Sequence, residues 1–298
     1  MSEIVLLDGG MGQELVKRSS LPSDPLWSAK VLMDEPEIVE AVHRDYINAG
    51  AKVLTLNTYS ATPERLAREA SEDLFEPLQA KAADIARAAI GEQDITIGGC
   101  LPPLYGSYHP EKTPDFEECL ETYRRIVAEQ KGAVDVFICE TLSSVKEVKA
   151  AVQAAAETGI PVWCAMSVMD RDGTRLRSQE PLLEGAMAAK QAGAAAVLIN
   201  CSWPEAVTQG LSDLATTGLP YGGLANGFTS IDALKVGGTV DVLQARTDLG
   251  PDAYADHVLE WVDNGASIVG GCCEVGPAHI ARLAKRLREA NHTIVGTT

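Results

Sequence analysis

Three cysteines are the residues of this chain best suited to chemistry. Cys201 closes the apolar run Ala-Val-Leu-Ile-Asn-Cys, and Cys272 and Cys273 close the run Ile-Val-Gly-Gly-Cys-Cys. Thiolates at the ends of two strands are suitable ligands for Zn²⁺, and a set of three protein ligands leaves one coordination position open, as in catalytic zinc sites. The spacing therefore favours a zinc site that acts on whatever molecule fills the open position.

The ligand type also indicates the kind of reaction. A substrate thiol in the open position would lose its proton and become a nucleophile at neutral pH. Thiolate ligands keep a bound sulfur electron-rich, which suits alkyl transfer better than hydrolysis. None of the five histidines follows a predicted strand, and this also speaks against a hydrolytic zinc site of the kind that histidines hold.

Adjacent cysteines have a second use, because Cys272 and Cys273 could form a vicinal disulfide in an oxidoreductase, at the cost of a strained backbone. For both to bind one metal ion, the chain must leave strand geometry after Gly270 and Gly271, since neighbouring side chains on a strand point to opposite faces. A single cysteine is more often a buried core residue, which is the favoured interpretation of Cys100, Cys119, Cys139 and Cys164.

Eight short apolar segments alternate with eight amphipathic ones along the chain. The predicted strands are Ile4–Asp8, Lys52–Asn57, Ile95–Cys100, Val134–Glu140, Val162–Val168, Ala195–Asn200, Tyr221–Ala225 and Ser267–Gly271. The predicted helices are Glu37–Ala49, Leu74–Ile90, Phe116–Lys131, Val145–Glu157, Leu182–Gln191, Pro204–Thr216, Tyr254–Asn264 and Pro277–Ala290. Continuous apolar runs suit parallel strands that are buried on both faces. Glycines in the left-handed position suit the helix ends at Gly50, Gly159, Gly193 and Gly265.

This alternation predicts an α/β protein, a (β/α)8 TIM barrel that forms a single domain over residues 1–298. The competing fold is an open doubly wound sheet, but the turn from Asp8 to Gly12 lacks the Gly-x-Gly-x-x-Gly spacing typical of that fold. Two long segments, 101–114 and 226–251, follow the carboxyl ends of strands, where barrel active sites form. We expect them to be walls of a substrate site.

Charge and composition limit the kinds of binding partner and the cellular compartment that we expect. The formal net charge of −17 disfavours binding to nucleic acid and to anionic membranes. No apolar run approaches the roughly 20 residues of a membrane span, and the beginning Met-Ser-Glu-Ile has no basic region of a signal peptide. We expect a cytoplasmic protein that acts on small molecules, and assembly into a homo-oligomer is left open.

Several motifs, in order from residue 4 to about residue 280, resemble the homocysteine S-methyltransferase family. They are Asp8-Gly9-Gly10-Met11-Gly12-Gln13-Glu14-Leu15, Asn57-Thr58-Tyr59, Glu140-Thr141-Leu142, Asn200-Cys201 and Gly270-Gly271-Cys272-Cys273. The resemblance implies a (β/α)8 barrel that binds zinc through Cys201, Cys272 and Cys273. It also implies that this barrel activates the thiol of homocysteine for methylation to methionine.

The same resemblance implies a set of substrate contacts. Asp8 and Glu140 would hold the amino group of the amino-acid substrate, and two strand-end carboxylates suit an ammonium group. Without the resemblance, Asp8 would be interpreted as a helix N-cap and Glu140 as an exposed charge. Asn57, Thr58 and Asn226 are further substrate-binding candidates, although the residues Leu-Ala before Asn226 depart from the Tyr-Pro-Asn motif of the family.

The methyl donor is the open question. The segments Gly99–Tyr105 and Glu274–Pro277 depart from the family pattern, and the chain has no room for the cobalamin and folate modules of large methionine synthases. This favours a small sulfonium donor, S-methylmethionine or S-adenosylmethionine, with betaine or a split cobalamin-dependent system as alternatives. Such cationic donors bind over aromatic faces, for which the candidates are Trp27, Tyr59, Tyr105, Tyr108 and Trp203.

Two further alternatives concern the acceptor and the class of protein. Selenohomocysteine or selenocysteine could replace homocysteine with little change in the site. A non-catalytic protein that stores zinc or binds thiols would carry the same three cysteines.

Overall fold

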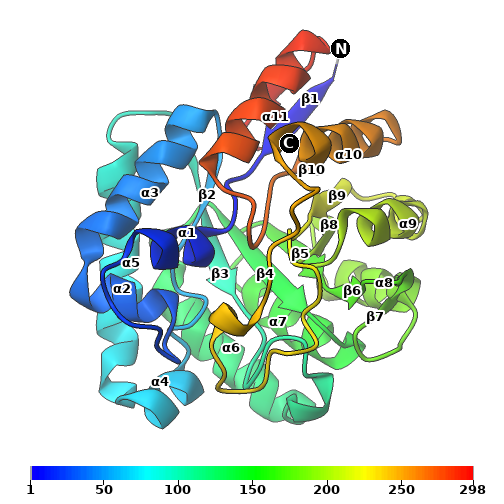
Figure 1. Ribbon diagram of the computed structural model, residues 1–298. Coiled ribbons are helices and arrows are strands. Elements are labelled where there is room, and N and C mark those ends of the chain that lie inside the picture. Colours follow the sequence, from blue (N-terminus) through cyan, green and yellow to red (C-terminus); the bar gives the residue numbers. More distant parts are fainter. Residues whose placement is uncertain (1, 298) are drawn as a thin grey trace.

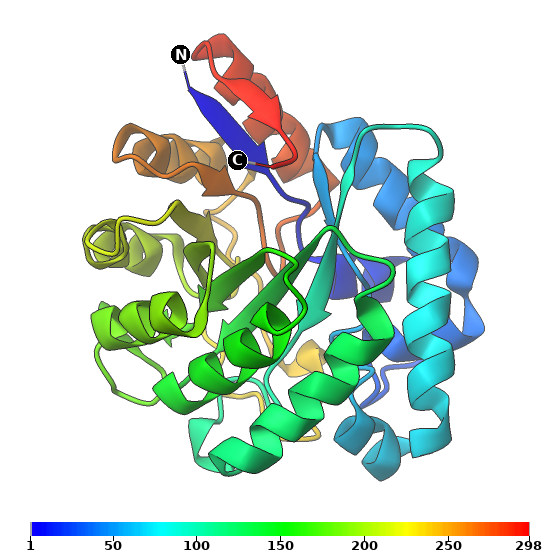
Figure 2. The same cartoon turned by 180° about the vertical axis from the view of Figure 1, so that it is seen from behind.

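The computed structural model describes residues 2–297, and its main sheet is a closed parallel barrel (Figures 1 and 2). The barrel strands are β1 Glu3–Leu6, β2 Val53–Thr55, β3 Thr96–Leu101, β4 Val136–Leu142, β5 Val162–Met166, β8 Ala196–Asn200, β9 Tyr221–Leu224 and β10 Ile268–Val269. A bridge between Leu7 and Val53 joins β1 to β2 and closes the ring. The closed ring of eight parallel strands confirms the predicted (β/α)8 barrel.

The eight predicted helices surround the barrel, and their ends lie within three residues of the predicted ones. They are α3 Pro36–Ala49, α5 Phe75–Ile90, α6 Phe116–Gln130, α7 Val145–Ala156, α8 Leu182–Ala192, α9 Pro204–Ala215, α10 Pro251–Asp263 and α11 Pro277–Glu289. The largest difference is at α10, which begins at Pro251 because proline suits the first helical position. The four predicted capping glycines all have positive φ, between 78° and 108°.

Several elements were not predicted from the sequence. The structure adds the short helices α1 Met11–Arg18, α2 Ser28–Asp34 and α4 Pro63–Glu69, and the 3-10 turns Glu72–Leu74, Pro110–Lys112 and Val240–Val242. It also adds the hairpin of β6 Val168–Met169 and β7 Asp172–Leu176, and a last strand, β11 Thr293–Val295. Strand β11 pairs in parallel with residues Glu3–Val5 of β1, which also pairs with β10, and the bridge to β2 follows at Leu7.

Alternation along the strands explains how polar residues reach the mouth of the barrel. The barrel interior is filled by one cluster of apolar side chains: Val5, Leu7, Val53, Val136, Ile138, Trp163, Ala165, Ala196, Leu198, Leu224 and Ile268. In β4, Val136 and Ile138 belong to this inner cluster, so Glu140 is the next inward position. In β8, Ala196 and Leu198 belong to it, and Asn200 follows in the same way.

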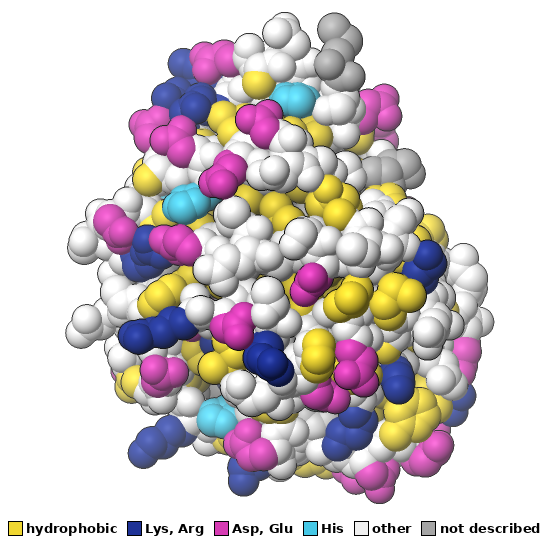
Figure 3. Space-filling view, turned by 90° about the vertical axis from the view of Figure 1, so that its right-hand side faces the viewer, with side chains coloured by type: hydrophobic (Ala, Val, Ile, Leu, Met, Phe, Trp, Pro, Cys, Tyr) yellow, Lys and Arg dark blue, Asp and Glu magenta, His cyan; other side chains and the backbone are white. Residues whose placement is uncertain are grey.

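The outer surface mixes charges of both signs. Figure 3 shows basic and acidic side chains interleaved on the face that carries α8 and α9. Many of them pair, as Arg246 does with Glu205 at 2.8 Å and Arg286 with Asp256 at 2.9 Å. Among residues 2–297, no helix combines the length and the apolar character needed to cross a membrane.

Candidate active site

A pocket with a cavity volume of about 140 Å³ opens at the carboxyl ends of the barrel strands. Its floor includes residues at or just after the ends of five different strands, Asp8, Asn57, Glu140, Cys201 and Cys272. Both long segments expected to form walls also contribute. The segment 101–114 supplies Tyr105 and Tyr108, and the segment 226–251 supplies Phe228 and Leu234–Gly238. The pocket therefore has a floor of strand ends and walls of loops.

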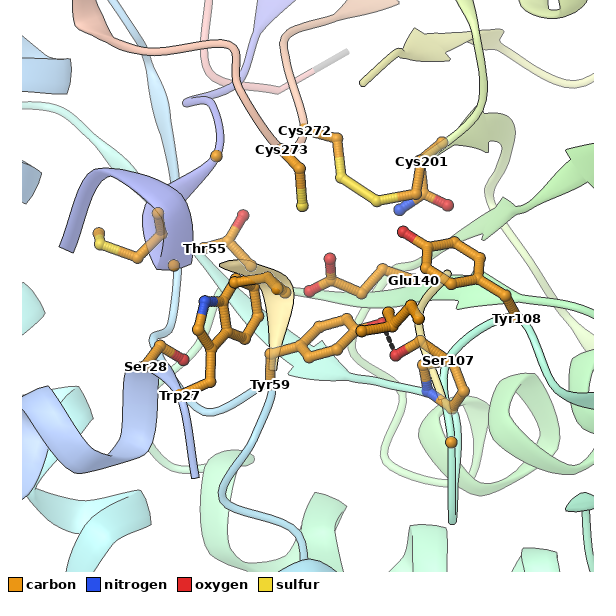
Figure 4. A pocket seen from close by; sticks show the side chains of 18 of the residues that line it. Trp27, Ser28, Thr55, Tyr59, Ser107, Tyr108, Glu140, Cys201, Cys272 and Cys273 are labelled. Carbon is orange, nitrogen blue, oxygen red and sulfur yellow. Dashed lines mark hydrogen bonds between the residues drawn. A yellow bond between two sulfur atoms is a disulfide. The ribbon is translucent and has the colours of Figure 1, made fainter. Parts of the chain in front are cut away.

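The three cysteines meet on one side of this pocket (Figure 4). Their sulfur atoms all lie within 4.8 Å of one another, and they are the only group in the described part of the chain with a ligand set able to hold a metal ion. Cys201 and Cys272 are joined in a disulfide, with their Cα atoms 5.6 Å apart, and Cys273 is a free thiol. The alternative of a vicinal disulfide between Cys272 and Cys273 is therefore wrong, because the loop after β8 brings Cys201 within bonding distance of Cys272.

The backbone leaves strand geometry where the cysteines require it. Strand β10 ends at Val269, so Gly270 and Gly271 already lie outside the sheet. The amide of Cys272 donates to the carbonyl oxygen of Ala225 at 2.9 Å, and the carbonyl oxygen of Cys273 accepts from the amide of Gly227 at 2.8 Å. Cys272 and Cys273 can then face one site despite their adjacency, as the sequence predicted.

The glycines after β1 allow a second loop to approach the cysteines closely. A side chain at Gly10 would place its Cβ 2.5 Å from the carbonyl oxygen of Cys272, and one at Gly12 would meet the indole ring of Trp27 at 2.2 Å. The amide of Gly10 donates to the carbonyl oxygen of Val275 at 2.9 Å. The motif that begins at Asp8 is therefore a packing partner of the cysteine turn as well as the source of a carboxyl group.

Asp8 and Glu140 bring two carboxyl groups to the same cavity. Asp8 accepts from the amide and the hydroxyl of Thr55, at 2.9 and 3.1 Å. It caps no helix, because α1 begins after Gly10 without a side-chain cap. Burial raises the pKa of Asp8 to about 7 and that of Glu140 to about 7, and the charge of Glu140 contributes to the rise at Asp8. The pocket thus holds two carboxyl groups that have no cationic partner within the described chain.

A side-chain clamp that the sequence did not reveal fixes the end of β4. The Oδ1 atom of Asn200 accepts from the amide of Thr141 at 2.8 Å, and its Nδ2 atom donates to the hydroxyl of Thr141 at 3.1 Å. Thr141 has φ 62°, a left-handed conformation that is uncommon for a non-glycine residue. Asn200 therefore stabilises the irregular end of β4 directly after Glu140 and links this strand to β8, which Cys201 follows.

The other three substrate-binding candidates differ in their placement. Asn57 lines the pocket and donates to the carbonyl oxygen of Ser28 at 3.2 Å. Thr58 and Asn226 are buried beside the pocket and do not belong to its lining. Thr58 accepts from Gln130, and Asn226 accepts from the amide of Phe228, both at 3.2 Å. A direct contact of these residues with substrate stays a prediction.

Four of the five aromatic candidates line the pocket, and these are Trp27, Tyr59, Tyr105 and Tyr108. The rings of Trp27 and Tyr59 meet edge to face, with their centroids 5.9 Å apart (Figure 4). The hydroxyl of Tyr59 is 2.8 Å from that of Ser107, which fixes the ring against the segment 101–114. Trp203 lies outside the lining and stacks against Arg246 instead.

Arg177, after the β6–β7 hairpin, supports the cysteine site and was missed from the sequence. Its guanidinium donates to the carbonyl oxygen of Cys201 at 3.2 Å, pairs with Asp170 at 2.9 Å and lies 5.3 Å from the centroid of the Tyr108 ring. The position of Arg177 in the sequence does not indicate these contacts, because the hairpin that positions the residue was itself unpredicted.

The chain is similar to known proteins over most of its length. A family model described as homocysteine S-methyltransferase matches residues 5–287. The homocysteine S-methyltransferase of Escherichia coli K12 is 32% identical over 95% of both chains. Homocysteine S-methyltransferase 4 of Zea mays is 29% identical over 96% of this chain and 90% of its own.

Solved structures of an E. coli homocysteine methyltransferase, MmuM, are similar over the whole barrel. The metallated form has a TM-score of 0.79 and 30% identity, and the oxidized form has a TM-score of 0.78 and 29% identity. Each alignment covers 95% of this chain and 96% of the solved chain.

Proposed function

This chain belongs to the homocysteine S-methyltransferase family, and we propose that it transfers a methyl group to the thiol of L-homocysteine, with Zn²⁺ held by Cys201, Cys272 and Cys273. The observation that carries the proposal is the meeting of three sulfur atoms and two carboxyl groups in one cavity. The sulfur atoms suit the thiol end of the substrate, and the carboxyl groups suit its ammonium end.

The cysteines fit a zinc ion by number, proximity and chemistry. Three thiolates within 4.8 Å of one another form a suitable donor set that leaves one position free. A zinc ion bound there would lower the pKa of a thiol in the free position and make that thiol nucleophilic at neutral pH. The disulfide between Cys201 and Cys272 must first be reduced, because its sulfur atoms cannot serve as thiolate ligands while they are bonded to each other.

The chain's own residues hold the amino end of the acceptor. An ammonium group between Asp8 and Glu140 favours their ionised forms, because it offsets the burial that raises the pKa of each to about 7. Thr55 fixes the carboxyl group of Asp8 by two hydrogen bonds. Asn57 borders the same cavity and is proposed as a further contact, and Thr58 and Asn226 are proposed as residues of the surrounding layer.

The donor proposed is a small sulfonium compound, S-methylmethionine or S-adenosylmethionine. The rings of Trp27, Tyr59 and Tyr108 line the pocket, and aromatic faces attract a cationic methyl-bearing centre. The attack of the acceptor sulfur forms a carbon–sulfur bond, and the bond between the methyl group and the donor sulfur breaks, so that the donor leaves as a neutral thioether.

The test uses protein that has been reduced and then loaded with zinc. Homocysteine is supplied with S-methylmethionine, S-adenosylmethionine, betaine or a methylcobalamin system, in separate reactions, and methionine is measured by mass spectrometry. We expect methionine from one sulfonium donor. Methionine from betaine or methylcobalamin alone would overturn the donor assignment, and zinc and homocysteine binding without methionine from any donor would indicate a non-catalytic protein. A parallel reaction with selenohomocysteine tests the breadth of the acceptor.

A further inference from the structure

The pocket carries basic side chains as well as acidic ones. Arg65 and Arg68 of α4 and Lys235 of the segment 226–251 belong to its lining, together with the carboxyl groups of Asp8 and Glu140. The acidic pair has a proposed ligand, the ammonium group of the acceptor. The basic residues have no proposed ligand.

Arg65 is the least exposed of these three basic residues, and it has no carboxylate partner among the described residues. Its Nε and Nη2 atoms donate to the carbonyl oxygen of Pro25 at 3.0 and 2.6 Å, and within residues 2–297 it forms no ion pair. Burial lowers the pKa of Arg65. Arg68, by contrast, pairs with Glu69 at 2.6 Å. A half-buried guanidinium without a carboxylate partner carries a desolvation cost, which an anionic ligand would offset.

The carboxylate nearest in sequence, that of Glu64, also lines the pocket, and only one of its two oxygen atoms has hydrogen-bond partners among the described residues. The Oε1 atom of Glu64 accepts from the hydroxyl of Thr62 at 2.7 Å and from the amide of Tyr105 at 3.2 Å. The side chain of Glu64 is therefore turned toward the segment 101–114 and forms no ion pair with Arg65. The charges that act on Arg65 are those of Glu64, Glu69 and Arg68, together with the Tyr59 hydroxyl.

Tyr59 lines the same pocket as Arg65 and the cysteines. Glu140 and Cys273 are among the groups that act electrostatically on the Tyr59 hydroxyl, and the Tyr59 hydroxyl is among those that act on Arg65. Figure 4 shows the Tyr59 ring across the cavity from Cys273, with Glu140 between them. The Tyr59 ring, Arg65 and the three cysteines thus border one cavity.

We propose that Arg65 binds the carboxylate of the methyl donor, so that the donor is a small molecule with a cationic methyl-bearing centre beside the aromatic rings and a carboxylate at its far end. The inference rests on the proposed function. The planar guanidinium can hold a carboxylate through two parallel hydrogen bonds, and its Nη1 atom donates to no described residue. The acceptor's own carboxylate is bonded to the carbon that carries its ammonium group, for which the proposed contacts are Asp8 and Glu140 and not Arg65.

The test separates the donor from the acceptor. Reduced, zinc-loaded wild-type protein, Arg65→Met and Arg65→Lys are assayed with S-methylmethionine and with its carboxamide, which lacks the negative charge. Arg44→Met is the matched control, because Arg44 pairs with Glu40 on the outer face of α3. We expect Arg65→Met to raise the KM for S-methylmethionine by about 10- to 100-fold, the range for a hydrogen bond to a charged group. The KM for homocysteine should change less than about twofold, and Arg65→Lys should recover part of the loss.

Three outcomes would overturn the subsite. They are an unchanged donor KM in Arg65→Met, a rise confined to the KM for homocysteine, and a wild-type protein that uses the carboxamide as well as S-methylmethionine. The last needs no variant and so does not depend on how the variants fold. If wild-type protein forms no methionine from S-methylmethionine, the donor assignment fails by itself. Calorimetric titration of S-methylmethionine into wild-type protein and Arg65→Met then decides the subsite separately, since equal binding to both rejects it.

Discussion

The three cysteines are proposed to bind one zinc ion together, so the loss of a single cysteine should be enough to weaken zinc binding. Replacing Cys201 or Cys273 by alanine removes one sulfur from a group of three, and a site with two thiolates binds zinc much more weakly. We expect zinc to fall from one equivalent per chain to well below one, and methionine formation to be lost, while the barrel stays folded. Metal analysis and circular dichroism measure the two effects.

The control for these variants is Cys119→Ala. Cys119 is a buried free thiol on α6, and its sulfur contacts the carbonyl oxygen of Pro114. This variant should keep its zinc and its activity. Full zinc content in Cys273→Ala would contradict the proposed ligand set.

The two carboxyl groups predict a pH dependence of amino-acid binding. The pKa of Asp8 and that of Glu140 are both about 7, above their usual values. Each carboxyl group therefore becomes negatively charged as the pH rises through neutrality, and only the charged form attracts an ammonium group. We expect the Kd of L-methionine, whose side chain does not titrate, to fall by about tenfold between pH 6 and pH 8.

Calorimetry on zinc-loaded protein measures this dependence. Asp8→Asn should bind L-methionine more weakly and with a flatter pH profile. Asp84→Asn, on the exposed face of α5, should behave as wild type, since the Asp84 side chain is 79% exposed. A Kd that rises with pH would exclude an ionised pair as the ammonium site.

At the scale of the elements, the clamp between Asn200 and Thr141 couples β8 to β4. Asn200→Ala leaves the buried amide of Thr141 without its acceptor, and an unsatisfied buried group costs about 1–3 kcal/mol. We expect a loss of unfolding free energy in this range and a higher KM for homocysteine, because Glu140 directly precedes Thr141. Urea denaturation and steady-state kinetics measure the two quantities.

An exposed asparagine supplies the comparison. Asn264 donates to the carbonyl oxygen of Glu260 at the end of α10, and Asn264→Ala should change both quantities little. An Asn200→Ala protein with wild-type stability would show that the clamp does not hold the turn.

The elements that could be predicted are those whose sequence pattern follows from burial. The barrel strands are apolar on both faces and the outer helices on one, so both types were located from their periodicity. Polar residues at strand ends, such as Asp8, Glu140 and Cys201, could be placed at the mouth because parallel strands end on the same side. Their sharing of one pocket follows from the barrel itself.

The elements that could not be predicted owe their positions to tertiary contacts. Helix α2 packs where Gly12 leaves space for Trp27, and neither residue alone indicates the other. The hairpin that positions Arg177 interrupts an apolar run that was predicted to be one strand as far as Val168. The disulfide partner of Cys272 depends on how close two separate loops lie, which no local pattern encodes.

At the scale of the whole molecule, the buried ring of His43 makes the free energy of unfolding depend on pH. This residue of α3 is completely buried, and neither of its ring nitrogen atoms has a hydrogen-bond partner among the described residues. Burial lowers its pKa from 6.5 to about 4. The unfolded chain therefore binds a proton at a pH where the folded chain does not, so folding loses stability as the pH falls from 6.5 toward 4.

The loss due to His43 should reach about 3 kcal/mol at the end of that interval. Buried carboxyl groups such as Glu147, whose pKa is raised to about 7, act in the opposite direction, since their protonation favours the folded state. The measurement is therefore the difference between wild type and His43→Leu in unfolding free energy from pH 7 to pH 4. The wild type should lose more; equal slopes would show that His43 does not titrate in this way. His292, on the surface beside Ser2, gives the matched variant His292→Leu.

The pocket is built from two kinds of backbone, strand ends on the side of the cysteines and carboxyl groups and loops on the side of Tyr105, Tyr108 and Lys235. Strand ends are constrained by the barrel and by the clamp at Asn200, whereas loops tolerate insertion and replacement. Mutations can therefore accumulate on the loop side of the pocket while the strand-end side stays unchanged. Descendants of such a barrel could exchange the molecule that gives the methyl group while keeping the one that receives it, and a protein engineer who seeks new donors should diversify Arg65 together with residues 101–114 and 226–251.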